Sequence, residues 1–358
     1  MQNVSHLLPF ANPYLIFLSI FAIEKMIGMI TKRHWFILSL AILTLCSCRH
    51  ENEEPKPQPQ PQPIPDDIYG EMNVTFDWSQ CEGQQPASMS LYLFNEENQS
   101  IPISFSNANG GKVQLLKGNY QAVAFNSDTE TMKASGSSWA DFTINVIPTT
   151  LEASARVFAG TRGIPKAVGT DEQEVIYEPE MLYTAADAGH EFKTTADDLR
   201  LIMKAATHNY TFTIDHVDNL SHVTSMSATL SGMASAFCPA TGLPTQSTAI
   251  IPFTLEAEGS ASLVGSVRCF GHCPEHSEEH KLVVYVQMDD GKKYYYGFDV
   301  TDALHDPNTL GGSEPGGTID MELEIDGLPL PEPIEDSSNT GLNPEVDGWE
   351  EITIGIEL

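Results

Sequence analysis

The chain has 358 residues, of which 18 are Lys or Arg and 49 are Asp or Glu, so its formal net charge is −31 at pH 7. Nucleic acids and anionic lipid surfaces are bound through basic patches, and this composition therefore argues against both as partners. The length allows two domains of ordinary size.

The beginning of the chain has the pattern of an export signal. A basic stretch at 32–34 precedes a short apolar run at 36–45, which is too short to span a bilayer as a mature helix. The sequence LCSC follows and resembles the lipobox of bacterial lipoproteins, in which a small residue precedes a cysteine that becomes acylated. A serine precedes Cys48 whereas a leucine precedes Cys46, so we expect Cys48 to carry the lipid. An ordinary secretory signal with incidental cysteines is the alternative.

The segments on either side of this signal have their own compositions. Met29 makes a better start than the first residue, so we expect 1–28 to be an over-extended N-terminus and 29–47 to be the signal peptide; an upstream transmembrane anchor is the alternative. Behind the lipidated cysteine, the acidic cluster at 51–54 resembles the signal that directs Bacteroidetes lipoproteins to the outer face of the cell. An alternating proline tract follows, and it predicts an extended spacer. Residues 48–67 are thus expected to form an acidic and Pro-rich tether.

Alternating apolar and polar residues, separated by turn residues, predict short strands in the first half of the chain. The expected strands are 72–78, 88–94, 113–115, 120–125 and 141–147. We therefore expect residues 68–147 to form an N-terminal β-sandwich. The segment 148–190 is irregular and polar, and it is expected to connect two domains.

The second half of the chain repeats this pattern. In HNYTFTIDH, alternation places Tyr210, Phe212 and Ile214 on one face, and Asp289-Asp290-Gly291 predicts a hairpin turn. Further strands are expected at 249–255, 261–270, 281–288, 292–298 and 318–325, with one helical turn at 299–304. Residues 191–326 are thus expected to form a C-terminal β-sandwich, and the fold class is all-β with two tandem sandwiches.

Several phrases of the sequence resemble a known family. They are VQLLKGNYQAVAFNSDTE, RCFGH, GFDVTDAL and the ending GLNPEVDGWEEITIGIEL. These phrases are similar to a group of Bacteroidales lipoproteins described as a domain of unknown function and related to fimbrillin and to fimbrial anchor and accessory subunits. The resemblance covers most of 71–358. It implies two transthyretin-like β-sandwiches in tandem, outer-membrane lipidation and a role in surface fimbriae or adhesion.

One cluster has the spacing of metal ligands. In CFGHCPEHSEEH, the side chains of Cys269, Cys273, His276 and His280 could converge on a tetrahedral ion, because Zn²⁺ accepts both sulfur and nitrogen ligands. Their order matches no standard zinc finger, and outside the cell a disulfide between the two cysteines competes for both sulfurs. We expect a loop disulfide or free thiols rather than a metal site, and no metal or other cofactor.

Motifs of catalysis are missing from the sequence. The chain has no Gly-x-Ser-x-Gly elbow, and the Gly-rich stretch at 311–317 lacks the Lys of a phosphate loop, so it is expected to be a turn. We expect no catalytic residues and no enzyme. The one dense aromatic cluster in the sequence is Tyr294, Tyr295 and Tyr296. Alternation places Tyr295 on the face opposite its two neighbours. Packing in the core and on the surface is therefore as good an explanation of the cluster as a sugar-binding face.

The last segment, 327–358, combines a Pro-rich linker with a terminal strand. The residues that define this strand are Trp349, Ile352, Ile354, Ile356 and Leu358, of which the four aliphatic ones share one face. This face must be buried either on an edge of the chain's own second sandwich or in a partner by strand addition. The sequence leaves both alternatives open.

These patterns together favour a cell-surface lipoprotein that is a structural subunit (anchor, accessory or tip) of a fimbria-like adhesive assembly. Its expected partners are the outer membrane, reached through the lipid on Cys48 with the protein facing the exterior, and other fimbrial subunits, reached by strand addition. A surface module that binds glycan or host protein is the alternative. Nucleic acid is not an expected partner.

Overall fold

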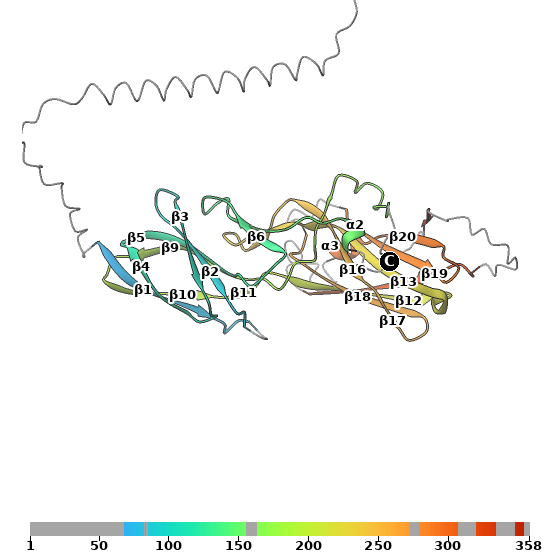
Figure 1. Cartoon of the computed structure of the whole chain (residues 1–358), viewed down its shortest axis with the longest axis horizontal. Helices are drawn as coiled ribbons and strands as arrows, with labels where there is room; N and C mark the ends of the chain where they lie inside the picture. Colours follow the sequence, from blue (N-terminus) through green and yellow to red (C-terminus); the bar gives the residue numbers. More distant parts are fainter. Residues whose placement is uncertain are drawn as a thin grey trace, which may run out of the picture. The chain divides into compact units, whose positions relative to one another are not determined.

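The computed structural model describes residues 68–81, 83, 85–154, 163–272, 279–306, 320–333 and 348–353 (Figure 1). Regular structure in these residues is almost entirely β, with only short helices: α2 (Leu151–Ser154), the 3₁₀ turn η2 (Leu220–His222) and α3 (Thr301–His305). The predicted all-β class is therefore confirmed. Among these described residues, no helix is long and apolar enough to cross a membrane.

Two sheets share the first hydrophobic core. Their strand orders are β10-β1-β4 and β11-β9-β5-β2-β3. The strands are β1 (Tyr69–Asp77), β2 (Met89–Phe94), β3 (Ser100–Phe105), β4 (Gly110–Leu116), β5 (Gly118–Asn126), β9 (Tyr183–Phe192), β10 (Ala196–Ile202) and β11 (Lys204–Ala205). Alternation explains the core: Met72, Val74 and Phe76 of β1 are buried, and they cluster with Leu91 and Leu93 of β2.

The strands β9 and β10 pair with strands of the first half of the chain. Residues 148–190 were expected to connect the domains and residue 191 to begin the second one. Instead, β9 pairs with β5, and β10 pairs in parallel with β1, from Glu71↔Ala196 to Asp77↔Ile202. A parallel partner requires a long crossover, so it lies far along the chain and sequence adjacency does not reveal it.

A small sheet of order β15-β14-β7-β6 joins segments that are distant in sequence. Its strands are β6 (Met132–Ser135), β7 (Thr143–Val146), β14 (Ala236–Cys238) and β15 (Leu243–Pro244). Ile144 of β7 lies opposite Phe237 of β14, and both are buried in the larger core cluster. Residues from both halves of the sequence thus contribute to one core.

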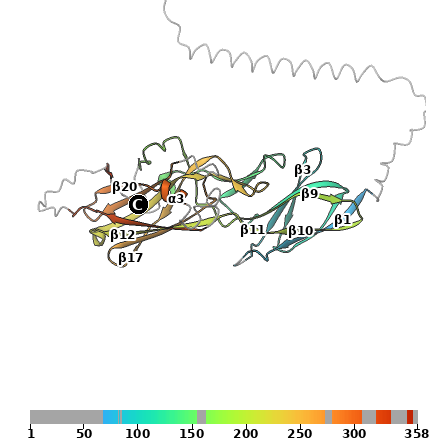
Figure 2. The same cartoon turned by 180° about the vertical axis from the view of Figure 1, so that it is seen from behind.

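The second pair of sheets has the orders β17-β18-β12-β21 and β22-β20-β19-β13-β16-β8 (Figure 1; seen from behind in Figure 2). The strands are β8 (Glu174–Val175), β12 (His208–Val217), β13 (Val223–Ala234), β16 (Thr248–Thr254), β17 (Glu256–Glu258), β18 (Ser262–Cys269), β19 (Lys281–Met288), β20 (Lys293–Asp299), β21 (Met321–Leu328) and β22 (Trp349–Thr353). Tyr210, Phe212 and Ile214 are fully buried on one face of β12, as predicted.

The six-stranded sheet is covered on both of its faces. Tyr294 and Tyr296 lie in the larger core, whereas Tyr295 packs on the opposite face in a smaller cluster with Tyr285, so the predicted alternation is confirmed. Gly291 closes the β19–β20 hairpin with a backbone hydrogen bond to Met288 and a φ of 83°, which confirms the predicted turn. The transthyretin-like assignment and the exact domain limits stay predictions.

Candidate functional site

The predicted lipidation site, Cys48, lies outside the described residues, as does the competing Cys46. The lipid anchor therefore stays a prediction. The first described strand, β1, begins at Tyr69, so the tether expected at 48–67 also precedes the part of the chain that the structure describes.

The C-terminal strand lies on an edge of its own six-stranded sheet. β22 pairs in parallel with β20, from Lys293↔Trp349 to Gly297↔Thr353. Trp349 is half-buried and meets the ring of Tyr285 edge-on, with ring centroids 5.4 Å apart. The residues Ile354, Ile356 and Leu358 lie outside the described residues.

The two anchoring side chains of β22 face opposite sides of the sheet. Trp349 packs on the smaller cluster, and Ile352, three residues further along, packs against the larger core. Opposite faces follow from the odd separation of these residues in a pleated strand. β22 therefore docks like an added edge strand, with a backbone ladder and one apolar anchor on each face.

Cys269 is buried and has no solvent-accessible surface. Its sulfur lies 3.9 Å from the backbone carbonyl oxygen of His208, and burial raises the pKa of the thiol to about 12. Among the described residues, Cys81, Cys238 and Cys269 form no disulfide with one another. The expected partners Cys273 and His276 lie outside the described residues, so the loop disulfide stays a prediction.

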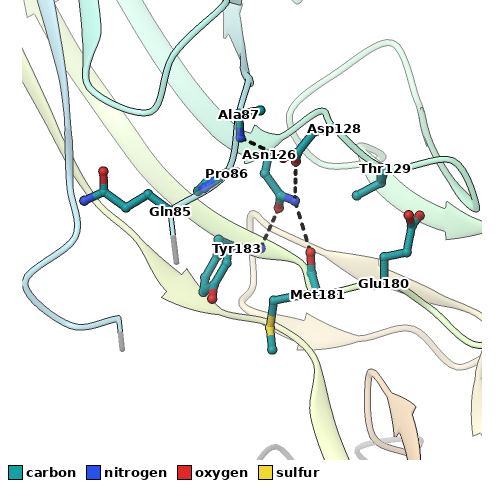
Figure 3. Close-up of a pocket in the computed structure, with 9 residues that line it drawn as sticks. All are labelled: Gln85, Pro86, Ala87, Asn126, Asp128, Thr129, Glu180, Met181 and Tyr183. Atoms are coloured by element: carbon teal, nitrogen blue, oxygen red, sulfur yellow. Dashed lines mark hydrogen bonds between the residues drawn. The ribbon is translucent and has the colours of Figure 1, made fainter. Parts of the chain in front are cut away.

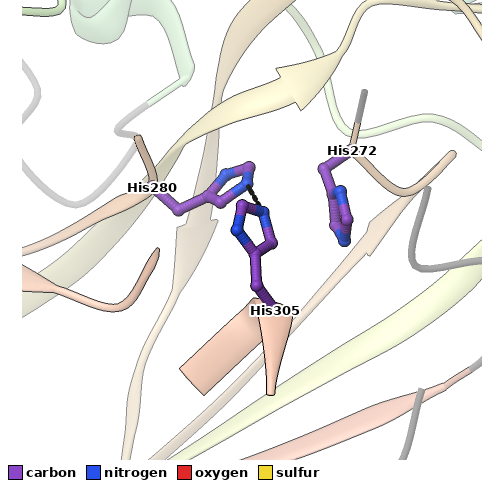
Figure 4. Close-up of side chains that lie close together, drawn as sticks. All are labelled: His272, His280 and His305. Atoms are coloured by element: carbon purple, nitrogen blue, oxygen red, sulfur yellow. Dashed lines mark hydrogen bonds between the residues drawn. The ribbon is translucent and has the colours of Figure 1, made fainter. Parts of the chain in front are cut away.

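His280 lies with two other histidines instead of with Cys269 (Figure 4). The nitrogen atoms of His272, His280 and His305 that could bind a metal all lie within 4.8 Å of one another. His272 follows β18, His280 precedes β19, and His305 is the last residue of α3. His272 and His280 are buried, and His305 is half-buried.

Sequence spacing did not indicate His305. It lies 25 positions beyond His280 and enters the cluster only because β19 and β20 form a hairpin that returns the chain to the start of β19. The sequence feature that could have indicated His305 was the predicted helical turn that directly follows β20. Because Val300 and Leu304 are fully buried, this turn is anchored in the core and presents His305 beside His280.

A cleft of about 550 Å³ lies beside Asn126 (Figure 3). The side-chain amide of Asn126 donates to Asp128 (3.1 Å) and to the carbonyl oxygen of Met181 (3.0 Å), and its oxygen accepts from the backbone N–H of Tyr183 (2.8 Å). The Glu180 carboxylate accepts two backbone N–H groups of a neighbouring loop, at 2.7 and 2.8 Å. These polar groups hold the walls of the cleft, and they also give it a hydrogen-bonding surface.

Solved structures resemble this fold at low sequence identity. A candidate adhesin of Bacteroides ovatus ATCC 8483 aligns with a TM-score of 0.55 and 16% identity, covering 75% of this chain and 95% of its own. The fimbrial anchor protein Mfa2 from Porphyromonas gingivalis aligns with a TM-score of 0.43 and 10% identity, covering 72% and 90%. A candidate polysaccharide-binding protein (DUF1812) of Bacteroides thetaiotaomicron VPI-5482 aligns with a TM-score of 0.45 and 12% identity, covering 72% and 90%. The first of these shows a shared fold.

Sequence comparison assigns the family. No curated protein matches the chain. The family model described as Domain of unknown function (DUF5119) matches residues 67–254, from the beginning of the first pair of sheets to the end of β16. This match spans more than half of the chain, and the predicted membership of a family of unknown function is confirmed: the chain belongs to the DUF5119 family.

Proposed function

We propose that this protein is a cell-surface lipoprotein that acts as a structural subunit (anchor, accessory or tip) of a fimbria-like adhesive assembly. The observation that carries the proposal is the docking of β22 along the β20 edge of the six-stranded sheet. The shared fold with the candidate adhesin of Bacteroides ovatus supports it. A non-enzymatic role agrees with the docking of β22 and with this shared fold.

Strand addition supplies the mechanism of assembly. A strand that reaches a sheet edge through a linker can pair with its own edge or with the same kind of edge on a neighbouring subunit, because the ladder of backbone hydrogen bonds is the same in both cases. Trp349 and Ile352 would supply the side-chain anchors in either case. The lipid on Cys48 would hold the subunit to the outer membrane, facing the exterior.

The proposal is tested by deleting residues 342–358 and, separately, by the substitution Ile352→Asp, with Glu350→Ala as a control at an exposed position of the same strand. If β22 links subunits, both changes abolish co-purification with the neighbouring subunit, and the control does not. If β22 only completes its own sheet, both changes lower the melting temperature and leave co-purification intact, which contradicts the assembly role. Burying a whole aliphatic side chain is worth about 1.5–3 kcal/mol, so a half-buried Ile352 accounts for a measurable part of this stability.

A second candidate function is the binding of glycan or host protein, and the cleft beside Asn126 favours it. Carboxylates such as those of Asp128 and Glu180 recognise sugar hydroxyls by accepting hydrogen bonds from them. A glycan array probed with the purified protein and with Asp128→Ala separates the two functions. Binding that the substitution abolishes supports the second candidate.

A further inference from the structure

We propose that His272, His280 and His305 form a binding site for a divalent transition-metal ion such as Zn²⁺. No metal was expected from the sequence, where the candidate ligands were two cysteines and two histidines of one loop. Among the described residues, the structure brings together three imidazoles from three separate segments, and of these only His280 belongs to that set (Figure 4).

The distances suit coordination. Nε2 of His280 and Nε2 of His305 are 3.1 Å apart. Two Zn–N bonds of about 2.0–2.1 Å at a tetrahedral angle place their nitrogen atoms about 3.3 Å apart, so an ion enters between these rings with little movement. The ring centroid of His272 lies 5.2 Å from that of His280 and 4.8 Å from that of His305.

The tautomer of His280 is fixed in the form that a metal requires. Nδ1 of His280 lies 3.1 Å from the backbone carbonyl oxygen of Ser231, and a carbonyl oxygen only accepts hydrogen bonds. Nδ1 therefore carries the hydrogen, and Nε2 of the neutral ring directs its lone pair toward His305. An imidazole that ligates a metal commonly donates its other N–H to a carbonyl or carboxylate in this way.

A bulge in β13 places this carbonyl group. The register of β13 against β16 shifts between Leu230 and Met233, and Gly232 within the shift has a φ of 77°. A Cβ atom on Gly232 would lie 2.6 Å from Nδ1 of His280, so only glycine allows the ring to approach the strand so closely. The N–H of Gly232 donates to the side chain of Gln173 (2.8 Å), which holds the bulge in place.

The segments that carry the histidines are themselves fixed. The backbone N–H of His280 donates to Oγ1 of Thr301, the first residue of α3, at 2.8 Å. His272 forms an isolated bridge with Met233. The cluster is therefore held by a bridge to β13 at His272, by the hydrogen bond to α3 at His280 and by the core-anchored turn that carries His305, and half-buried His305 leaves a route for an ion from solvent.

A hydrogen-bonded group of neutral imidazoles is the competing interpretation. It accounts for the contact between His280 and His305, in which Nε2 of His305 donates. A metal site requires a third ring to converge on the first two, whereas a hydrogen bond between two imidazoles does not require it. Three imidazoles are a ligand set that suits Zn²⁺, Cu²⁺ and Ni²⁺, and three protein ligands are the number found where zinc keeps a fourth position for another ligand.

The test is a calorimetric titration of Zn²⁺ into the mature protein after dialysis against a chelator. We expect one ion per chain, and we expect His305→Gln to lower the affinity roughly tenfold or more. His222→Gln is the matched control, because His222 is a partly exposed histidine that pairs with Asp289 in the β19–β20 hairpin. Melting curves recorded without metal show whether each variant is folded, so that a loss of affinity can be assigned to the lost imidazole. Half-buried His305 can be changed without opening the core.

Three results would overturn the proposal. The first is the absence of stoichiometric binding of Zn²⁺, Co²⁺ and Cu²⁺ by the unmodified protein, which leaves only a group of hydrogen-bonded imidazoles. The second is an equal affinity in His305→Gln, His272→Gln and the unmodified protein. The third is a loss of affinity in His276→Gln but not in His305→Gln, which would restore the ligand set expected from the sequence. Binding should also weaken in acid, because imidazole ligands must be neutral to coordinate.

Discussion

Burial holds several ionisable side chains of the second pair of sheets in their neutral forms. Burial raises the pKa of Cys269 and of Tyr285 to about 12 each, and it raises the pKa of Tyr296 as well. The hydroxyl of Tyr285 donates to the carbonyl oxygen of Pro165 at 2.7 Å. This bond ties the segment before β8 to the outer face of the six-stranded sheet.

The substitution Tyr285→Phe should change stability in a pH-dependent way. At pH 8 the loss of the hydrogen bond to Pro165 should cost about 0.5–1.5 kcal/mol. In the unfolded chain Tyr285 ionises near its ordinary pKa of 10.0, whereas in the folded chain its pKa is about 12. The contribution of this hydroxyl is therefore fully present below pH 10 and is lost between pH 10 and 12, at about 1.4 kcal/mol per pH unit.

Urea unfolding at pH 8 and pH 11 measures this difference. The difference in free energy of unfolding between the unmodified protein and Tyr285→Phe should become smaller or change sign at the higher pH. A gap of the same size at both values would show that the Tyr285 hydroxyl titrates alike in the folded and unfolded chains.

Cys269 should resist alkylation in the native protein. Its thiol is buried and its pKa is about 12, so little thiolate is accessible at pH 8. Iodoacetamide labelling followed by mass spectrometry should modify half-buried Cys238 first and Cys269 only after urea is added. Equal labelling rates of the two cysteines in the native protein would contradict the buried position of Cys269.

The candidate metal site could be predicted from the sequence only in part. His280 was identified from local spacing. The position of Cys269 also follows from alternation, because it shares a face of β18 with buried Leu263 and Val267, and this pattern argues against a ligand role. His305 depends on the closing of the hairpin and on the bulge at Gly232, and single-strand patterns do not contain that information.

At the scale of elements, strands that alternate between buried and exposed residues were predictable, whereas the long strand β13 was not. β12 alternates strictly, and its predicted range agrees with the structure. β13 was not predicted, although it is the strand that pairs with both β16 and β19. Its sequence, VTSMSATLSGMA, is rich in small and polar residues, and its second half is buried throughout, so no period-two pattern remains.

Two glycines in strands should respond in opposite ways to the same substitution. In Gly265→Ala the added Cβ would lie 2.5 Å from Cδ2 of Leu255 and 2.9 Å from the carbonyl oxygen of Thr254, so overpacking should cost about 1–3 kcal/mol. In Gly297→Ala nothing lies within 4 Å of the added Cβ, and the loss of unfolded-chain entropy should stabilise the protein by about 0.4–1 kcal/mol.

Urea denaturation of both variants measures this contrast. Neither glycine has a φ in the left-handed region, so backbone strain does not enter the comparison. If the two variants have equal stability, the close approach of β16 to β18 at Gly265 is not a constraint on the fold.

At the scale of the whole molecule, the described residues from 68 onward belong to one compact unit by their contacts. β10 completes the sheet that β1 begins, and β14 extends the sheet of β7, so strands from distant parts of the sequence complete each other's sheets. A fragment that ended at residue 147 would lose β10, one of the two partners of β1, and β9, one of the two partners of β5. This is why domain limits drawn from contiguous strands alone differ from the observed pairing.

The proposed lipid anchor belongs to the scale of the whole molecule, because it would decide where the folded unit is held. Cys48→Ala should abolish incorporation of labelled palmitate and leave the chain unprocessed or released, since the lipid on Cys48 is the proposed covalent link to the membrane. The melting temperature should not change, because the first strand begins at Tyr69, well beyond the modified residue. Cys46→Ala is the matched control and should keep the label. Label that survives Cys48→Ala but is lost in Cys46→Ala would move the site by two residues, whereas label that survives both substitutions would remove the lipoprotein assignment and, with it, the proposed attachment of the subunit to the cell surface.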